Sequence, residues 1–247
     1  MPVIIELPQV ASTNTYVKQH AASLPDGALV HTPCQSAGRG QKGNSWESEP
    51  GKNLTFSLLL KRPRVDVKRQ FAISEAVSLA IVEALDELTP LRIKWPNDIY
   101  ADDRKLAGIL IEHDLDADGI VHTVVGVGLN VNQTVFRSDA PNPVSLAQLT
   151  GRELPLPQLL ERVGTAIEQY CRFDSNAAGF EALHTRYLSR LYRRDGHPHP
   201  FAVPGDDAPF MATIVDVDPD GMLTLRHSSG TLHRYAFKEV SFIISPD

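Results

Sequence analysis

Short apolar stretches separated by turn residues dominate the first half of the chain, a pattern typical of strands. The stretch at residues 54–60 is nearly continuous, as expected of a strand that is covered on both faces. The strand before Pro96 must end there, because proline cannot donate to a strand ladder and restricts the residue before it. Strands are predicted over residues 3–7, 28–32, 53–60, 91–94, 99–100, 106–112 and 120–132.

Apolar residues recur at helical spacing in five other segments. The longest, residues 67–88, contains neither glycine nor proline and places its apolar residues on one side. Ser12, Thr13 and Asn14 supply the side chains with which helices often begin, so a helix is expected to follow them and to end near residue 22. Further helices are predicted over residues 144–149, 156–173 and 178–191.

The pattern changes after Asp195, where prolines interrupt the chain at positions 198, 200, 204 and 209. Alternating strands are then predicted in two pairs, over residues 210–217, 222–227, 231–237 and 240–244. We therefore expect an α+β fold in two domains. A mixed α+β domain would occupy residues 1–193, and a small β-barrel or β-sandwich would occupy residues 194–247.

The composition excludes several classes of protein. Of the 247 residues, 42% are hydrophobic and 22% are charged, which is enough for a substantial core. A net charge of −6 gives no general positive field for nucleic acid, and no apolar run approaches the roughly 20 residues that span a bilayer. Two cysteines, Cys34 and Cys171, form neither a disulfide framework nor a zinc site. A cytoplasmic location is expected.

A glycine-rich loop lies between two of the predicted strands. Residues 38–43 read GRGQKG, a literal match to the dinucleotide-binding fingerprint, but a strand follows here instead of the required helix. The loop still brings backbone N–H groups together with Arg39 and Lys42, which suits an anion. Trp46 suits either stacking on a base or packing in the core. A flexible surface loop with two solvated cations is an equal alternative on these residues alone.

A second candidate segment ends the strand near residue 94. Residues 94–98 read KWPND and combine a basic, an aromatic, a turn and an acidic residue. Lys105 opens the following strand, in which Ala107 and Gly108 leave the backbone accessible to a ligand. Taken alone, Lys105 is more simply interpreted as an ordinary hairpin lysine.

Together these segments resemble the catalytic domain of biotin protein ligases, in its short form without an N-terminal DNA-binding domain. The matching motifs are AGRGQKGNSW at residues 37–46, KWPND at 94–98, DRKLAGILIE at 103–112 and GVGLNVN at 126–132. Residues 12–14 also match the family's early S-T-N element. The resemblance implies a mixed β-sheet flanked by helices in the first domain and a small SH3-like β-barrel in the second. The resemblance covers essentially the whole chain, with the motifs in the family's order.

The resemblance implies an ATP-dependent ligase that works in two steps. The biotin carboxylate attacks the α-phosphorus of ATP with Mg²⁺ present, which gives biotinyl-5′-AMP and pyrophosphate. The ε-amine of a lysine on a biotin carboxyl carrier protein then attacks this anhydride and releases AMP. Because the first step brings two anions together, fixed cations are needed to hold them in line. The expected protein partner is the carrier of an acyl-CoA carboxylase, with no membrane partner.

The resemblance also assigns roles to residues. Lys105 would contact the biotin carboxylate and the bridging phosphate, and Arg39 would hold the acyl-phosphate. Asp98 would bind Mg²⁺, deprotonate the incoming lysine, or stabilise the turn after Pro96; no metal ligand is assigned beyond this. Biotin is expected to contact Ser12, Thr13, Asn14, Gln35, Gly108, Ile109, Gly126 and Gly128. The nucleotide is expected to contact Gly38, Arg39, Gly40, Gln41, Lys42, Gly43, Trp46, Lys94, Asn97 and Asn130.

The chain departs from the family pattern in two places. Many family members carry further arginines where this chain has Gln41 and Asn44, so weaker retention of the adenylate is expected. The first predicted strand begins at Val3, which leaves no room for the winged-helix domain of the family's repressors, so no DNA partner is expected. A homodimer through an exposed sheet edge at residues 120–132 is compatible with the pattern but not required by it.

Two other functions stay open. Lipoate- and octanoate-transferring enzymes share the general fold and modify carrier lysines, although the KWPND segment and the GRG loop favour biotin. A non-catalytic sensor of biotinyl-5′-AMP would belong to a different class, and the presence of both Lys105 and Arg39 argues against it. His197 and His199 resemble a metal clip without a third ligand, and we expect an exposed linker pair.

Overall fold

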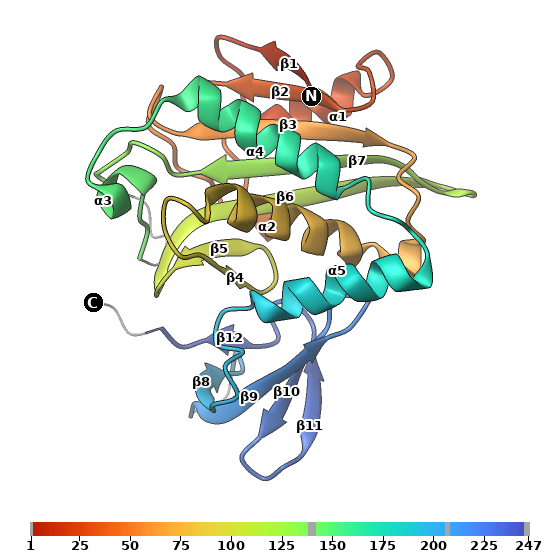
Figure 1. The fold of residues 1–247 in the computed structure, drawn as a ribbon, viewed down its shortest axis with the longest axis vertical. Coiled ribbons are helices and arrows are strands. Elements are labelled where there is room, and N and C mark those ends of the chain that lie inside the picture. The colour runs from red at the N-terminus through yellow and green to blue at the C-terminus, as the bar shows by residue number, and fades with distance from the viewer. Residues whose placement is uncertain (1, 138–141, 206–207, 245–247) are drawn as a thin grey trace.

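The computed structural model describes residues 2–137, 142–205 and 208–244, which form two sheets with helices packed on the larger one (Figure 1). The helices are α1 (Thr13–His20), α2 (Phe71–Leu85), α3 (Leu146–Thr150), α4 (Leu156–Tyr170) and α5 (Ala177–Ser189), with short 3-10 turns η1 (Gln41–Gly43) and η2 (Val67–Arg69). The strands are β1 (Val3–Glu6), β2 (Ala28–Thr32), β3 (Leu54–Lys61), β4 (Arg92–Lys94), β5 (Asp98–Ala101), β6 (Arg104–Asp116), β7 (Gly119–Leu129), β8 (His199–Ala202), β9 (Phe210–Val217), β10 (Leu223–His227), β11 (Leu232–Tyr235) and β12 (Ser241–Phe242). Among these helices none is both long and apolar enough to cross a membrane.

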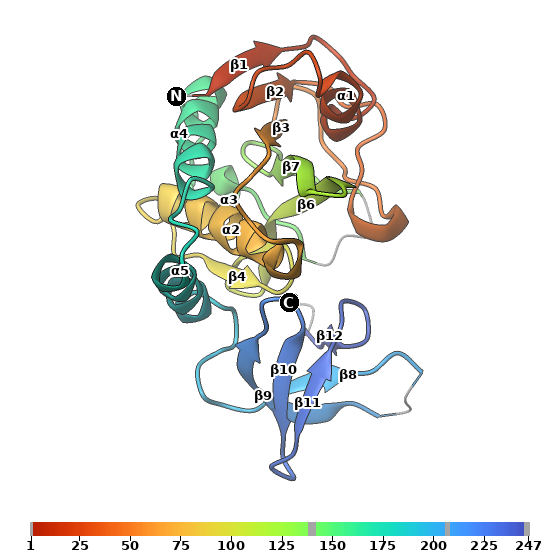
Figure 2. The same cartoon turned by 90° about the vertical axis from the view of Figure 1, so that its right-hand side faces the viewer.

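The larger sheet contains seven strands in the order β1-β2-β3-β7-β6-β5-β4. Strands β1 and β2 pair in parallel, whereas the other neighbours pair antiparallel. Helices α2 and α4 cover one face of the sheet, and α1 lies on the other (Figure 2). The predicted α+β class, with a mixed sheet flanked by helices, is confirmed.

Strand β3 runs through the middle of the core. Its residues from Leu54 to Leu60 are all buried. Phe56 and Leu58 join the large cluster beneath α2, whereas Leu59 joins a smaller cluster with Val17 of α1. Apolar side chains are therefore needed on both faces of this strand, which explains its continuous apolar sequence.

The face of the sheet that carries α1 is filled at one end and bare at the other. Val124 of β7 belongs to the same apolar cluster as Val17 of α1. Gly126 and Gly128 lie two and four positions further along the same face of β7. The register places Gly108 of β6 directly opposite Gly128. Because glycines put no side chain above the strands, this end of the sheet can form the floor of a cavity.

The second sheet is antiparallel, with the order β11-β10-β9-β8-β12. Among the described residues its two end strands, β11 and β12, are not paired with each other, so the predicted SH3-like module is an open sheet here and not a closed barrel. The sequence pattern missed β8, because Pro200 lies inside it. Pro200 still accepts a hydrogen bond from the backbone N–H of Ile243, 3.1 Å away. The boundary between residues 193 and 194 stays a prediction.

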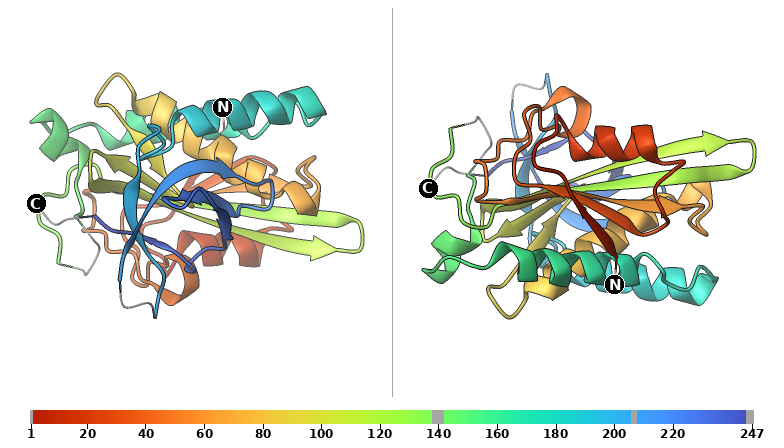
Figure 3. Two further views of the ribbon diagram at one scale, coloured as in Figure 1. Left: turned by 90° about the horizontal axis from the view of Figure 1, so that it is seen from below. Right: turned by 90° about the horizontal axis from the view of Figure 1, so that it is seen from above.

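Two smaller expectations prove wrong. His199 belongs to β8, and its Nε2 lies 3.0 Å from Asp195, so it is not part of an exposed linker pair with His197. The segment 120–132 is not a sheet edge, because β7 pairs with β3 on one side and β6 on the other. Strand β6 pairs with β5 only from Arg104 to Gly108. Beyond Gly108, β6 and β7 continue as a hairpin that projects past the end of β5 (Figure 3).

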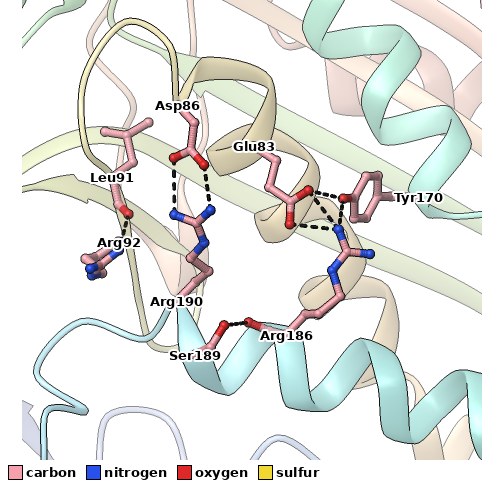
Figure 4. Close-up of polar contacts among 8 residues, drawn as sticks. All are labelled: Glu83, Asp86, Leu91, Arg92, Tyr170, Arg186, Ser189 and Arg190. Carbon is pink, nitrogen blue, oxygen red and sulfur yellow. Dashed lines mark hydrogen bonds and ion pairs between the residues drawn. The ribbon is translucent and has the colours of Figure 1, made fainter.

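Helix α5 is fixed to α2 by paired charges on neighbouring turns (Figure 4). Arg186 of α5 contacts Glu83 of α2 at 2.8 and 2.9 Å, and both side chains hydrogen-bond to the hydroxyl of Tyr170 at the end of α4. One turn further, Arg190 binds Asp86 at 2.6 and 3.3 Å. These contacts hold α5 in place immediately before the chain enters the second sheet.

The second sheet is attached to the first through the segment that contains KWPND. The indole N–H of Trp95 donates to the carbonyl of Gly221, 2.9 Å away, in the turn between β9 and β10. Phe237 packs edge to face on the same indole, with 6.3 Å between the ring centroids. Trp95 is 2% exposed, so its principal contacts are structural.

A histidine between two carboxylates makes a second attachment. His184 of α5 lies 2.7 Å from Glu75 of α2 and 2.9 Å from Asp216 of β9. Burial raises the pKa of the Glu75 carboxyl, and the hydrogen bond to Glu75 raises the pKa of His184. The imidazole thus balances a carboxylate that is almost fully inside the protein.

We predict that His184→Ala lowers the free energy of unfolding at pH 7 by about 1–3 kcal/mol, because the buried Glu75 loses its hydrogen-bond partner. Adding Glu75→Gln should recover part of this loss, since no buried carboxylate then remains. Urea unfolding of both variants tests this, with His197→Ala as the exposed control. A double variant no more stable than His184→Ala would show that the carboxylate is not the source of the loss.

Candidate functional site

A cavity of about 880 Å³ lies above the bare end of the larger sheet. The glycine-rich loop, the KWPND segment and the second sheet all contribute to its lining. Most of the residues predicted for the site line this cavity: Ser12, Thr13, Asn14, Gln35, Arg39, Gly40, Gln41, Gly43, Trp46, Lys94, Asn97, Asp98, Lys105, Gly108, Ile109, Gly126, Gly128 and Asn130. Gly38 does not line it, and the side chain of Lys42 lies outside the described part of the structure.

The glycine-rich loop folds back on itself as a short hairpin. The N–H of Gly40 bonds to the carbonyl of Asn44 at 2.7 Å, and that of Trp46 to Gly38 at 3.0 Å. A Cβ at Gly38 would come closer than 3.0 Å to the Trp46 carbonyl, so the close approach of the two arms requires glycine. At the tip, Gly43 has φ +89°, which also favours glycine. The hairpin aims Trp46 back over the sheet.

Trp46 lies against the glycines of the floor. A Cβ at either Gly108 or Gly128 would come closer than 3.0 Å to the indole ring. The indole Nε1 is buried and has no hydrogen-bond partner among the described residues. The Lys105 ammonium lies 5.8 Å from the ring centroid. An aromatic plane with a free donor beside a cation is suited to a planar, polar ligand.

A buried polar cluster occupies the end of the cavity beneath α1. The Ser57 hydroxyl of β3 lies 2.7 Å from Thr13 Oγ1 and 2.6 Å from Asn14 Oδ1. The backbone N–H of Thr13 donates to Gln35 Oε1 at 2.8 Å. Such closely linked donors and acceptors, next to apolar walls, suit a small ligand with several fixed polar atoms.

Gly126 makes room for Asn14. A Cβ at position 126 would come well within 3.0 Å of the Asn14 side chain. Asn14 Nδ2 also donates to the Leu110 carbonyl at 3.1 Å and to Glu112 at 3.0 Å. The glycine and these three partners, Ser57 included, fix the orientation of the Asn14 amide.

Two basic side chains reach the site from different elements. Arg39 of the hairpin binds Glu112 of β6 at 2.8 Å and Thr15 of α1 at 3.2 Å. Lys105, at the start of β6, forms an ion pair of 2.7 Å with Asp98 of β5. The Lys105 and Asp98 side chains are 20% and 14% exposed, so this pair is largely shielded from water. Both cations are already paired with carboxylates.

Lys94 is the most deeply placed cation of the cavity. Its ammonium lies 5.3 Å from the Tyr100 ring and 4.9 Å from the Phe242 ring of β12. Burial lowers the pKa of Lys94, with the positive charges of Lys105 and Arg193 acting in the same direction and Asp98 opposing them. An anion would be drawn to such a desolvated cation.

Asn97 and Asn130 have a mainly structural part in the arrangement. The Asn97 amide donates to the Ile109 carbonyl at 2.7 Å, and the Asn130 amide donates to the Val144 carbonyl at 3.1 Å. These bonds fix the turn after β4 and the segment that follows β7. Both residues therefore hold two sides of the cavity in position.

Several residues of the site were not found from the sequence. Ser57 and Glu112 sit in apolar strands, and the polar interruption of each strand is the signal that could have identified them. The contribution of the second sheet had no such signal, because it depends on how the two sheets meet. From that part of the chain the cavity is lined by Pro204, Phe237, Lys238, Val240, Ser241 and Phe242.

Known proteins resemble this chain in both sequence and fold. The model of the Biotin/lipoate A/B protein ligase family matches residues 6–130, about half of the chain. The biotin--[acetyl-CoA-carboxylase] ligase of Paracoccus denitrificans is 28% identical over 232 residues, which cover 91% of this chain and 94% of that protein. The bifunctional ligase/repressor BirA of Bacillus subtilis is 27% identical over 221 residues, or 87% of this chain. This chain spans 66% of that protein's length and 39% of the Escherichia coli protein of the same name.

In fold, the chain is similar to a biotin protein ligase from Aquifex aeolicus in complex with biotin and ATP. The TM-score is 0.79 at 24% identity, and the match covers 99% of this chain and 100% of the other. The matched family region contains the hairpin, β3 to β7 and the glycine floor described above. The chain belongs to the Biotin/lipoate A/B protein ligase family.

Proposed function

We propose that this chain is an ATP-dependent biotin protein ligase, which makes biotinyl-5′-AMP and transfers biotin to a lysine of a carrier protein. The observation that carries the proposal is the convergence of a polar ligand site at Asn14 with two cations, Arg39 and Lys105, in one cavity. The similarity to the Paracoccus denitrificans ligase along 91% of the chain supports biotin as the substrate.

In the first step a carboxylate approaches the α-phosphate of ATP, so two anions must be held together. We assign the polar cluster around Thr13 and Asn14 to the ureido ring of biotin, because it offers fixed donors and acceptors beside apolar walls. Arg39 and Lys105 would exchange their carboxylate partners for the acyl-phosphate. This exchange neutralises the phosphate as charge develops on it and positions the reacting groups in line.

In the second step a lysine of the carrier attacks the anhydride, and its ammonium must first lose a proton. Asp98 lies in the cavity beside Lys105. Once Lys105 turns to the phosphate, the Asp98 carboxylate becomes available to accept that proton. We therefore assign Asp98 to this role, with the lysine then free to attack the acyl carbon.

We propose that Mg²⁺ enters the cavity as an ion carried by the phosphates of ATP. Over residues 2–137, 142–205 and 208–244, no three acidic, histidine or cysteine side chains are grouped to hold a metal. Mg²⁺ commonly binds one carboxylate together with phosphate oxygens and water. Asp98 would supply that carboxylate in the first step, before it accepts the proton of the carrier lysine in the second. When bound, Mg²⁺ would supply further neutralisation of the phosphates.

The protein partner that we propose is the biotin carboxyl carrier of an acyl-CoA carboxylase, because the Paracoccus denitrificans relative is named for acetyl-CoA carboxylase. A cytoplasmic location, a homodimer and the absence of DNA binding stay predictions of the sequence.

The central test is transfer of radiolabelled biotin to a biotin-carrier domain. Wild type should label the carrier when biotin, ATP and Mg²⁺ are all present. Lys105→Ala should lower the transfer rate by about 100-fold or more, since it removes a charge that stabilises the transition state. Lys18→Ala is the control, because Lys18 pairs with Asp114 outside the cavity. Wild type that binds the adenylate without transferring it would indicate a sensor, and transfer of lipoate instead of biotin would indicate the related lipoyl activity.

Gly126→Ala should raise the KM for biotin by roughly tenfold or more, because the added Cβ displaces Asn14 and its hydrogen bonds are lost. The KM for ATP should change much less. Val125→Ala, on the opposite face of the same strand, is the control for damage to the sheet. An unchanged KM for biotin in the Gly126→Ala variant would remove Asn14 from the biotin site.

Gln41→Arg should slow the release of biotinyl-5′-AMP by roughly tenfold, because the hairpin gains a fixed cation that can bind phosphate. Rapid dilution of the preformed complex measures this rate directly. Gln158→Arg on the exposed surface of α4 adds the same charge elsewhere and should leave release unchanged. Equal release rates for Gln41→Arg and wild type would contradict a phosphate contact at the hairpin tip.

A further inference from the structure

Glu112 joins the two parts of the site. Its carboxylate accepts a hydrogen bond from Asn14 Nδ2 at 3.0 Å and from Arg39 at 2.8 and 3.3 Å. The Arg39 side chain is 45% exposed and that of Glu112 is 23% exposed, so water reaches this pair. One carboxylate thus contacts both a proposed biotin residue and a proposed phosphate residue.

Arg39 has both terminal nitrogens engaged by Glu112. The guanidinium binds the carboxylate through two nitrogens, an arrangement that it would also use for phosphate oxygens. Burial acts to raise the pKa of Glu112, but hydrogen bonds from Arg39 and Asn14 lower it overall, so Glu112 is ionised at neutral pH. An acyl-phosphate must therefore displace a charged competitor before it can bind Arg39.

Glu112 differs from the other acidic residues on its face of β6. Asp114 and Asp116 follow on the same face of β6, where they pair with Lys18 at 2.9 Å and Arg62 at 3.5 Å. Neither of these pairs lines the cavity, whereas Arg39 does. Glu112 is thus the member of the row whose partner is shared with the ligand site.

We propose that Glu112 is a positioning residue that competes with the acyl-phosphate of biotinyl-5′-AMP for Arg39 and so speeds release of that intermediate. The inference rests on the proposed ligase function. Weak retention of the adenylate is already expected because Gln41 replaces an arginine of the family. The competition by Glu112 would be a second cause, and it would act through Arg39.

The test is Glu112→Gln, which keeps the shape of the side chain and an oxygen for Asn14 while removing the charge. Release of biotinyl-5′-AMP from the preformed complex should slow by about three- to fivefold, the effect expected of a solvent-accessible ion pair. Asp114→Asn, on the same face of β6, should release the adenylate at the wild-type rate. An unchanged or faster release from a folded Glu112→Gln variant overturns the proposal.

Two further measurements separate this mechanism from a structural effect. In an Arg39→Gln background, Glu112→Gln should have no additional effect on release, because the competition needs Arg39; a full additional effect counts against it. If Glu112→Gln melts early, release is compared with wild type at a lower temperature at which both proteins are folded, with the same expected direction. Wild type that fails to bind added biotinyl-5′-AMP overturns the ligase function and this inference together. Wild type that binds and transfers, with no slowing in the variants, overturns this inference alone.

Discussion

The whole site depends on three glycines that lie together on one face of the larger sheet. Gly108 of β6 and Gly128 of β7 lie opposite each other, and Gly126 lies two residues before Gly128 on the same face of β7. Helices α2 and α4 cover the opposite face of the sheet, so the cavity lies on the face that carries these glycines. The absence of three Cβ atoms leaves a surface on which Trp46 and Asn14 can rest.

Above that floor, three polar side chains of the cavity already have partners. Lys105 pairs with Asp98, Arg39 pairs with Glu112, and Asn14 is held by Ser57 and Glu112. A ligand that binds these three side chains must replace existing contacts, and its affinity reflects the difference between the two sets. The indole N–H of Trp46 differs, because it has no partner among the described residues and gains one without losing another.

Much of this arrangement was predictable from the sequence, and the rest was not for identifiable reasons. The continuous apolar run of β3 and the glycine-rich loop before it are local patterns, and the order of the elements followed from such patterns. Most of the lining residues were instead predicted from the motifs that the chain shares with biotin protein ligases. The interior position of β7 depends on strand pairing across the fold, and a pattern of alternating residues does not reveal its neighbours. Strand β8 was missed because Pro200 normally argues against a strand. The part played by Phe242 depends on how two sheets meet, which neither sheet's own sequence records.

The KWPND segment contributes both to the cavity and to the contact with the second sheet. Lys94 and Asp98 line the cavity, while the indole of Trp95 is bonded to Gly221 and packed on Phe237 of the second sheet. A displacement of this turn and a displacement of the second sheet would therefore be coupled through the side chain of one tryptophan, which lies between the cavity and the second sheet.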